Sequence, residues 1–178
     1  MGYRPPAPVV RWGDMTLVTE DIPNPELRAL YTYWAGKRRG TALPSRADID
    51  PAEITALLPH LMLWDVLRDP LDFRVRLAGT EVCRRFGEEL TGKRLRQIDL
   101  DGMTERFFAD YALAVDSQEP RLDMHEYERH DSRYMHYAHL ILPLTGEDGQ
   151  VNMLLVGQRA VGVDGYSCRP QRAGPRDF

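Results

Sequence analysis

Cysteine is scarce in this chain of 178 residues, which contains only Cys83 and Cys168. The two lie far apart and form no CxxC pair, which argues against a disulfide framework or a cysteine-based zinc site. No apolar run approaches the roughly 20 residues that a membrane-spanning helix needs. The first residues also lack the apolar core of a signal peptide. We therefore expect a cytoplasmic protein that is not inserted in a membrane.

A dominant charge of one sign is also missing. The chain has 23 Lys and Arg against 27 Asp and Glu, a formal net charge of −4, and 43% of its residues are hydrophobic. This balance argues against a strongly basic nucleic-acid-binding protein and against a chain kept disordered by its charge. The length supports one domain of ordinary size with short terminal segments.

Motifs of the common catalytic sites are absent as well. The sequence contains no P-loop, no GxGxxG turn and no serine in a GxSxG setting. The acidic residues Glu88, Glu89, Asp99 and Asp101 are interpreted as capping and turn charges rather than as an acid–base pair. We therefore expect no enzymatic activity.

The two ends differ from the middle of the chain. Residues 4–8 read Arg-Pro-Pro-Ala-Pro, and residues 169–178 have almost nothing apolar to bury. Proline removes backbone donors and fixes φ, so neither stretch favours regular structure. We expect a flexible arm over residues 1–23, one domain over 24–161 and a flexible tail over 162–178.

Helices are predicted where capping signals precede apolar residues at helical spacing. Asn24-Pro25 begins a helix over 24–39, and Asp50-Pro51 begins a short one. Further helices are expected over 81–86 and 103–117. The first helix carries one apolar stripe, which we predict to form a dimer interface or to cover the sheet: Leu27, Leu30, Tyr31 and Trp34.

Strands are predicted where apolar and polar residues alternate. Residues 61–67 and 73–77 form an expected hairpin, and three consecutive strands follow at about 121–130, 134–144 and 150–161. The element order predicts an α+β fold with a five-stranded antiparallel sheet and helices packed on a face.

The expected turns set a register for the last three strands. They place 124 opposite 140, and 142 opposite 153. One face then carries an apolar band that should meet the 103–117 helix: Leu122, Met124, Leu140, Leu142, Met153 and Leu155. The other face is also apolar and needs a cover, either the 24–39 helix or a second subunit: Tyr137, His139, Ile141, Leu154 and Val156.

Histidines concentrate in the hairpin formed by the third and fourth strands. The expected register places His125 opposite His139, and Glu128 opposite His136. Two imidazoles, or an imidazole and a carboxylate, on facing strands are a possible metal-ligand pair. The alternative is a polar strand end that binds no metal, and the sequence does not decide between the two.

The ordered set of elements resembles a PAS domain. The resemblance rests on Leu77-Ala-Gly-Thr-Glu-Val-Cys-Arg-Arg-Phe-Gly87, on Phe86-Gly-Glu-Glu-Leu-Thr-Gly-Lys93 and on Pro143-Leu-Thr-Gly-Glu-Asp-Gly149. Together with the segments around 33–46 and 63–66, it is similar to a small, stand-alone bacterial branch of this superfamily. It covers residues 25–161 and implies a sheet and helices that enclose a small pocket, used for sensing or for protein contact.

The resemblance does not name a cofactor. Haem is disfavoured because the 103–117 helix, a common source of the axial ligand in PAS haem sensors, has no histidine. Covalent flavin chemistry is disfavoured because the segment 92–98 lacks the cysteine of the flavin photosensors. Arg84 and Arg85 near the expected pocket entrance are candidates for contact with an anionic ligand, or they form a solvated helix face.

Two functions are compatible with these patterns. The first is a sensory or regulatory module that binds a small, mainly apolar ligand and signals in trans to an unknown protein partner, as a homodimer. The second is an interaction or dimerisation module whose core is filled by its own side chains. The expected ligand-binding residues are Phe73, Leu77, Phe86, Phe107, Tyr111, Met124, Leu140 and Met153.

Overall fold

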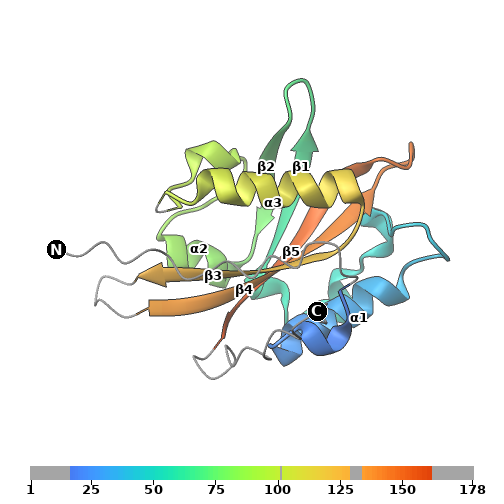
Figure 1. The fold of residues 1–178 in the computed structure, drawn as a ribbon, viewed down its shortest axis with the longest axis horizontal. Helices are drawn as coiled ribbons and strands as arrows, with labels where there is room; N and C mark the ends of the chain where they lie inside the picture. Colours follow the sequence, from blue (N-terminus) through green and yellow to red (C-terminus); the bar gives the residue numbers. More distant parts are fainter. Residues whose placement is uncertain (1–16, 101, 129–133, 162–178) are drawn as a thin grey trace, which may run out of the picture.

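The fold is built on one antiparallel sheet. The computed structural model describes residues 17–100, 102–128 and 134–161. Its five strands are β1 (Leu61–Leu67), β2 (Asp72–Ala78), β3 (Arg121–Glu128), β4 (Tyr134–Thr145) and β5 (Val151–Val161), arranged in the order β2-β1-β5-β4-β3. The predicted α+β class and the five predicted strands are confirmed. Both faces of the sheet are covered by helices (Figure 1).

The helix α1 (Pro25–Gly36) covers the outer face of the sheet. Asn24 caps it as predicted, because its Oδ1 accepts hydrogen bonds from the backbone N–H groups of Glu26 and Leu27. Trp34 is fully buried, and its Nε1 donates to the carbonyl of Pro143 on β4 at 3.0 Å. The predicted helix therefore exists and packs on its own sheet.

Most of the apolar stripe of α1 is buried by this packing. Leu27, Leu30 and Trp34 are buried in the single chain, and the hydroxyl of half-buried Tyr31 donates to the carbonyl of Leu17 at 2.9 Å. This burial favours the alternative in which the stripe covers the chain's own sheet, and the dimer interface stays a prediction. Leu17 and Ile22 are buried as well, and packing therefore begins within the stretch predicted as an arm.

The other, inner face of the sheet is covered by two helices and a connecting segment. The helix α2 (Thr80–Phe86) ends at Gly87, whose φ of 72° lies in the left-handed region that favours glycine. The helix α3 (Thr104–Ser117) crosses the sheet (Figure 1). Between them, the segment 88–100 is tied to the edge of β2, where the N–H of Val75 donates to the carbonyl of Lys93 and the carbonyl of Val75 accepts from the N–H of Gly92.

The predicted register is wrong by two residues at both hairpins. Leu122 faces Leu140 instead of residue 142, and Leu142 faces Leu155 instead of residue 153. At the β4–β5 turn, Thr145 pairs with Val151 rather than with residue 150, and an irregularity between Leu144 and Thr145 adds the second residue of shift. A shift of two leaves each side chain on its face, because the side-chain period of a strand is two.

The cover assigned to each face is also wrong. The band that was expected to meet the long helix packs against α1: Leu122, Leu140, Leu142 and Leu155, with Met124 and Met153 beside them. Conversely, Ile141, Leu154 and Val156 form a core with Phe107 and Tyr111 of α3. Both faces are apolar enough to be buried, so alternation alone could not tell which helix covers which face.

Within the part of the chain that the structure describes, no helix is long and apolar enough to cross a membrane. The stretches 1–16 and 162–178, which contain most of the predicted arm and the predicted tail, lie outside the described residues.

Candidate functional site

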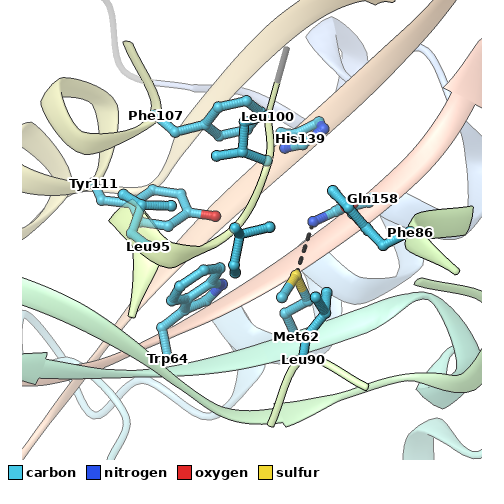
Figure 2. Close-up of a pocket in the computed structure, with 11 residues that line it drawn as sticks. Met62, Trp64, Phe86, Leu90, Leu95, Leu100, Phe107, Tyr111, His139 and Gln158 are labelled. Atoms are coloured by element: carbon cyan, nitrogen blue, oxygen red, sulfur yellow. Dashed lines mark hydrogen bonds between the residues drawn. The ribbon is translucent and has the colours of Figure 1, made fainter. Parts of the chain in front are cut away.

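A pocket lies between the inner face of the sheet, α2, α3 and the segment 88–100 (Figure 2). The volume that the centre of a water molecule can reach in it is about 10 Å³, about the space that one water needs. Its walls are mainly apolar and aromatic, with a few polar groups, as is usual for small-molecule sites. The lining residues are Met62, Trp64, Phe86, Leu90, Leu95, Ile98, Leu100, Phe107, Tyr111, His139 and Gln158.

An aromatic cluster holds one wall of the pocket. The ring of Tyr111 on α3 lies edge-on to Trp64 of β1, with 5.2 Å between centroids, and to Phe73 of β2, with 5.3 Å. Phe108 also packs edge-on against Phe73 at 5.3 Å. Edge-to-face pairs of this kind add about 0.5–1.5 kcal/mol to the free energy gained from burial. The cluster therefore fixes α3 on β1 and β2.

Two buried histidines meet at the opposite wall. His125 on β3 and His139 on β4 are each 1% exposed, and their ring centroids lie 4.5 Å apart. Phe107 of α3 covers both rings, with its centroid 4.4 Å from that of His125 and 5.0 Å from that of His139. The Nδ1 and Nε2 atoms of both imidazoles have no hydrogen-bond partner among the residues described.

Both imidazoles are held in the neutral form. Burial lowers the pKa of His125 from 6.5 to about 3, and the positive charge of Arg106 contributes to the shift. Burial also holds the pKa of His139 well below 6.5, with smaller contributions from His125, Arg85 and Arg106. A neutral imidazole has one N–H donor and one acceptor nitrogen. At neutral pH, each ring therefore offers both kinds of hydrogen bond and uses neither within the described chain.

Two more polar side chains reach the pocket from β1 and β5. Trp64 is buried, and its Nε1, which is only a donor, has no partner among the described residues. Gln158 is partnered: its Oε1 accepts from Arg85 of α2, and its Nε2 donates to the sulfur of Met62 at 3.1 Å (Figure 2). An unpaired buried polar group costs about 1–3 kcal/mol, so Trp64 and the histidines are notable exceptions in this core.

Arg85 is bonded to one of the residues that line the pocket, Gln158. Its guanidinium binds Gln158 and lies over the rings of Phe86 and Tyr137, 5.1 and 4.5 Å from their centroids. Arg84, the other arginine singled out in the sequence, is bonded to Glu81 on the exposed face of α2. Of the two, only Arg85 is placed to influence a molecule in the pocket.

The sequence-predicted ligand residues divide into three groups. Phe86, Phe107 and Tyr111 line the pocket, and Phe73 packs behind it against Tyr111. Leu77 is 49% exposed on β2. The remaining three, Met124, Leu140 and Met153, belong to the core under α1. The prediction placed their face of the sheet under the 103–117 helix instead.

Sequence reasoning missed the polar lining of the pocket. His139 was assigned to the outer face, and Trp64 and Gln158 were not singled out. One signal was present: Gln158 is an uncharged polar residue that directly follows the apolar run 153–157. The long helix supplies no histidine, whereas β4 supplies the imidazole of His139 at the pocket.

The predicted metal-ligand pairs do not form as expected. His125 pairs with Tyr137 and His139 with Asp123, so the two histidines are diagonal neighbours. Glu128 pairs with Tyr134 rather than with His136. Over the described ranges, no three His, Cys, Asp or Glu side chains come together. Two imidazoles are fewer than the three or four protein ligands of ordinary zinc sites.

Comparison with known proteins agrees with this architecture. The family model described as PAS domain matches residues 22–157. The chain is similar to the solved structure described as VqmA bound to DPO, with a TM-score of 0.50 and 9% identity over 62% of this chain and 56% of that one. No curated protein matches the chain.

Two further solved structures resemble the fold. The Rhodobacter sphaeroides LOV protein has a TM-score of 0.46 and 18% identity, over 66% of this chain and 71% of that one. A PAS domain from Colwellia psychrerythraea has a TM-score of 0.43 and 15% identity, over 63% and 98%. The family match contains the three helices, the first four strands and most of β5, and the chain therefore belongs to the PAS domain family.

Proposed function

We propose that this PAS domain is a sensory module that binds a small, mainly apolar molecule between the sheet and α3. The observation that supports the proposal is the pocket itself, in which buried Trp64 and His139 have polar atoms without partners among the described residues. Such atoms are rare in native cores and are often explained by a bound molecule or water. The rest of the lining is apolar or aromatic, which suits a mainly apolar ligand.

The comparisons support ligand binding only in general terms. VqmA, which shares the fold at 9% identity, is described as bound to DPO. That likeness concerns the fold, and it does not extend the ligand to this chain. No catalytic role is proposed, and the sensed molecule would act by changing the contacts of the domain with a separate protein or with a second copy.

A second function is supported by the small volume of the pocket. The pocket has a volume of about 10 Å³, which is space for about one water. A core filled by its own side chains leaves a cavity of this size. In that case the domain would serve as an interaction module, and the unpaired polar atoms would bind a buried water. The stripe of α1 is buried against the sheet, so a contact with a partner would use another surface.

Native mass spectrometry of the freshly purified full chain separates the two functions. Under the first, an excess mass is present and disappears after denaturation. The variant Leu100→Trp fills the pocket from its lining, and we expect it to lose that mass. The matched control Leu113→Trp adds the same ring at an exposed site on α3 and should keep it. A wild-type chain that carries no excess mass, and that binds none of acetophenone, benzoate and ethylbenzene in a calorimetric titration, would contradict ligand binding.

A further inference from the structure

The unpaired polar groups at the pocket have a common chemistry, which narrows the ligand class. This inference rests on the proposed function. The indole of Trp64 can only donate, and the neutral imidazole of His139 supplies a second N–H group. The amide of Gln158 already uses its oxygen to accept from Arg85. The open hydrogen-bonding capacity therefore includes two N–H donors from different walls of the pocket, seen in Figure 2.

The charges around the pocket favour the same kind of ligand. Arg85 is held at the pocket by Gln158, and Arg106 of α3 is fixed by a bond from its Nη2 to the carbonyl of Met124 at 3.0 Å. The buried carboxylate of Asp123, which pairs in register with His139, has Arg121 at 3.9 Å. Asp123 thus has a cation beside it, whereas Arg85 and Arg106 add positive potential near the histidines.

We propose that the pocket recognises an oxygen acceptor, a carbonyl or a carboxylate, on a small molecule whose remaining surface is apolar. The N–H groups of Trp64 and His139 are the donors available to the oxygen acceptor, and the rings of Trp64, Phe107 and Tyr111 contact the apolar body. Binding moves the segment 88–100, which carries Leu90, Leu95, Ile98 and Leu100, because the closed pocket has space for about one water. His125 supports His139 from the side.

Three probes of similar size test the assignment: acetophenone, benzoate and ethylbenzene, titrated into the full chain by calorimetry. A hydrogen bond to a donor that is otherwise unpaired is worth about a tenfold change in affinity. We therefore expect acetophenone or benzoate to bind at least about tenfold more tightly than ethylbenzene. If acetophenone binds more tightly than benzoate, the recognised group is an uncharged carbonyl. If benzoate binds more tightly, it is a carboxylate.

Two variants remove the donors and place an apolar side chain at each position. Trp64→Phe keeps an aromatic ring without Nε1, and His139→Leu replaces the imidazole by an apolar group of similar size. Each should reduce about tenfold the ratio by which the oxygenated probe binds more tightly than ethylbenzene. His139→Gln keeps an N–H donor and should restore part of the preference. Leu113→Ala, at an exposed site of α3, is the matched control.

The outcomes distinguish this inference from the proposed function. Ethylbenzene binding as tightly as the other two probes would overturn the oxygen-acceptor assignment and leave a ligand pocket in place. If no probe binds but native mass spectrometry finds a copurified molecule, its composition decides: a molecule without a carbonyl or carboxylate oxygen overturns the assignment. If no probe binds and no copurified molecule is found, both the assignment and the proposed function fail.

Discussion

The buried histidine pair makes the stability of the domain sensitive to mild acid. In the folded chain, His125 has a pKa of about 3 and His139 a pKa well below 6.5, both chiefly because of burial. In the unfolded chain both imidazoles take up a proton near pH 6.5. Below that pH the unfolded state binds more protons than the folded state, so the free energy of unfolding falls as the pH falls.

The size of this effect follows from the same values. Between pH 7.5 and 5.0, one imidazole that stays neutral when folded and titrates near 6.5 when unfolded costs about 2 kcal/mol of stability. The two together cost about 4 kcal/mol, a large share of the roughly 5–15 kcal/mol that stabilises an ordinary domain. With a urea m value of about 2 kcal/mol per M, the unfolding midpoint should fall by about 2 M.

Urea unfolding of the full chain at several pH values between 5.0 and 7.5 measures this loss. The single variants His125→Leu and His139→Leu should each remove about half of it, and the double variant nearly all. At pH 7.5 each variant should be as stable as the wild type or more stable, because it removes an unpaired buried polar group worth about 1–3 kcal/mol. Leu113→Ala is the control, and its pH profile should match the wild type.

One result would refute this reasoning. If the double variant lost as much stability as the wild type between pH 7.5 and 5.0, the imidazoles would have to take up protons in the folded state. The carboxylates whose pKa values are lowered, those of Asp48, Glu53 and Glu89, titrate below this range and do not interfere.

Three further predictions concern the scaffold, each checked by urea unfolding. Gly79→Ala should cost about 3 kcal/mol or more, because a Cβ there would lie 2.3 Å from the carbonyl oxygens of Leu58 and Pro59; Gly36→Ala, which meets nothing within 4 Å, should be neutral or stabilising. Trp34→Ala should cost about 3–5 kcal/mol without changing the sedimentation coefficient, and a shift from dimer to monomer at unchanged stability would contradict the packing of α1. Asn24→Ala should cost about 0.5–2 kcal/mol through loss of the cap, and an unchanged midpoint would speak against it.

Local patterns were sufficient to predict most of the secondary structure. Asn24-Pro25 marks the start of α1, because a side-chain cap and a fixed φ act within one turn of the helix. The alternation of Phe73, Val75 and Leu77 with arginines predicts β2, because successive side chains of a strand point to opposite faces of the sheet. These signals depend only on neighbours in the sequence, so they can be interpreted without knowledge of the fold.

Register depended on features that local patterns do not encode. The β4–β5 turn is one residue longer than expected, and the irregularity beside Thr145 adds another. The face of each strand was still predicted correctly in relative terms, because a shift of two conserves the alternation.

Only the tertiary structure decided which layer each face meets, and with it the candidate site. The strands β4 and β5 are apolar on both faces, so burying either face under α3 would satisfy the hydrophobic pattern equally well. The fold brings Ile141, Leu154 and Val156 under α3 and places Leu140 under α1. That choice puts His139 and Gln158 at the pocket, because they share a face with Ile141 and Val156. The sequence determined that both faces are buried, whereas the packing of α1 and α3 determined which polar groups line the pocket.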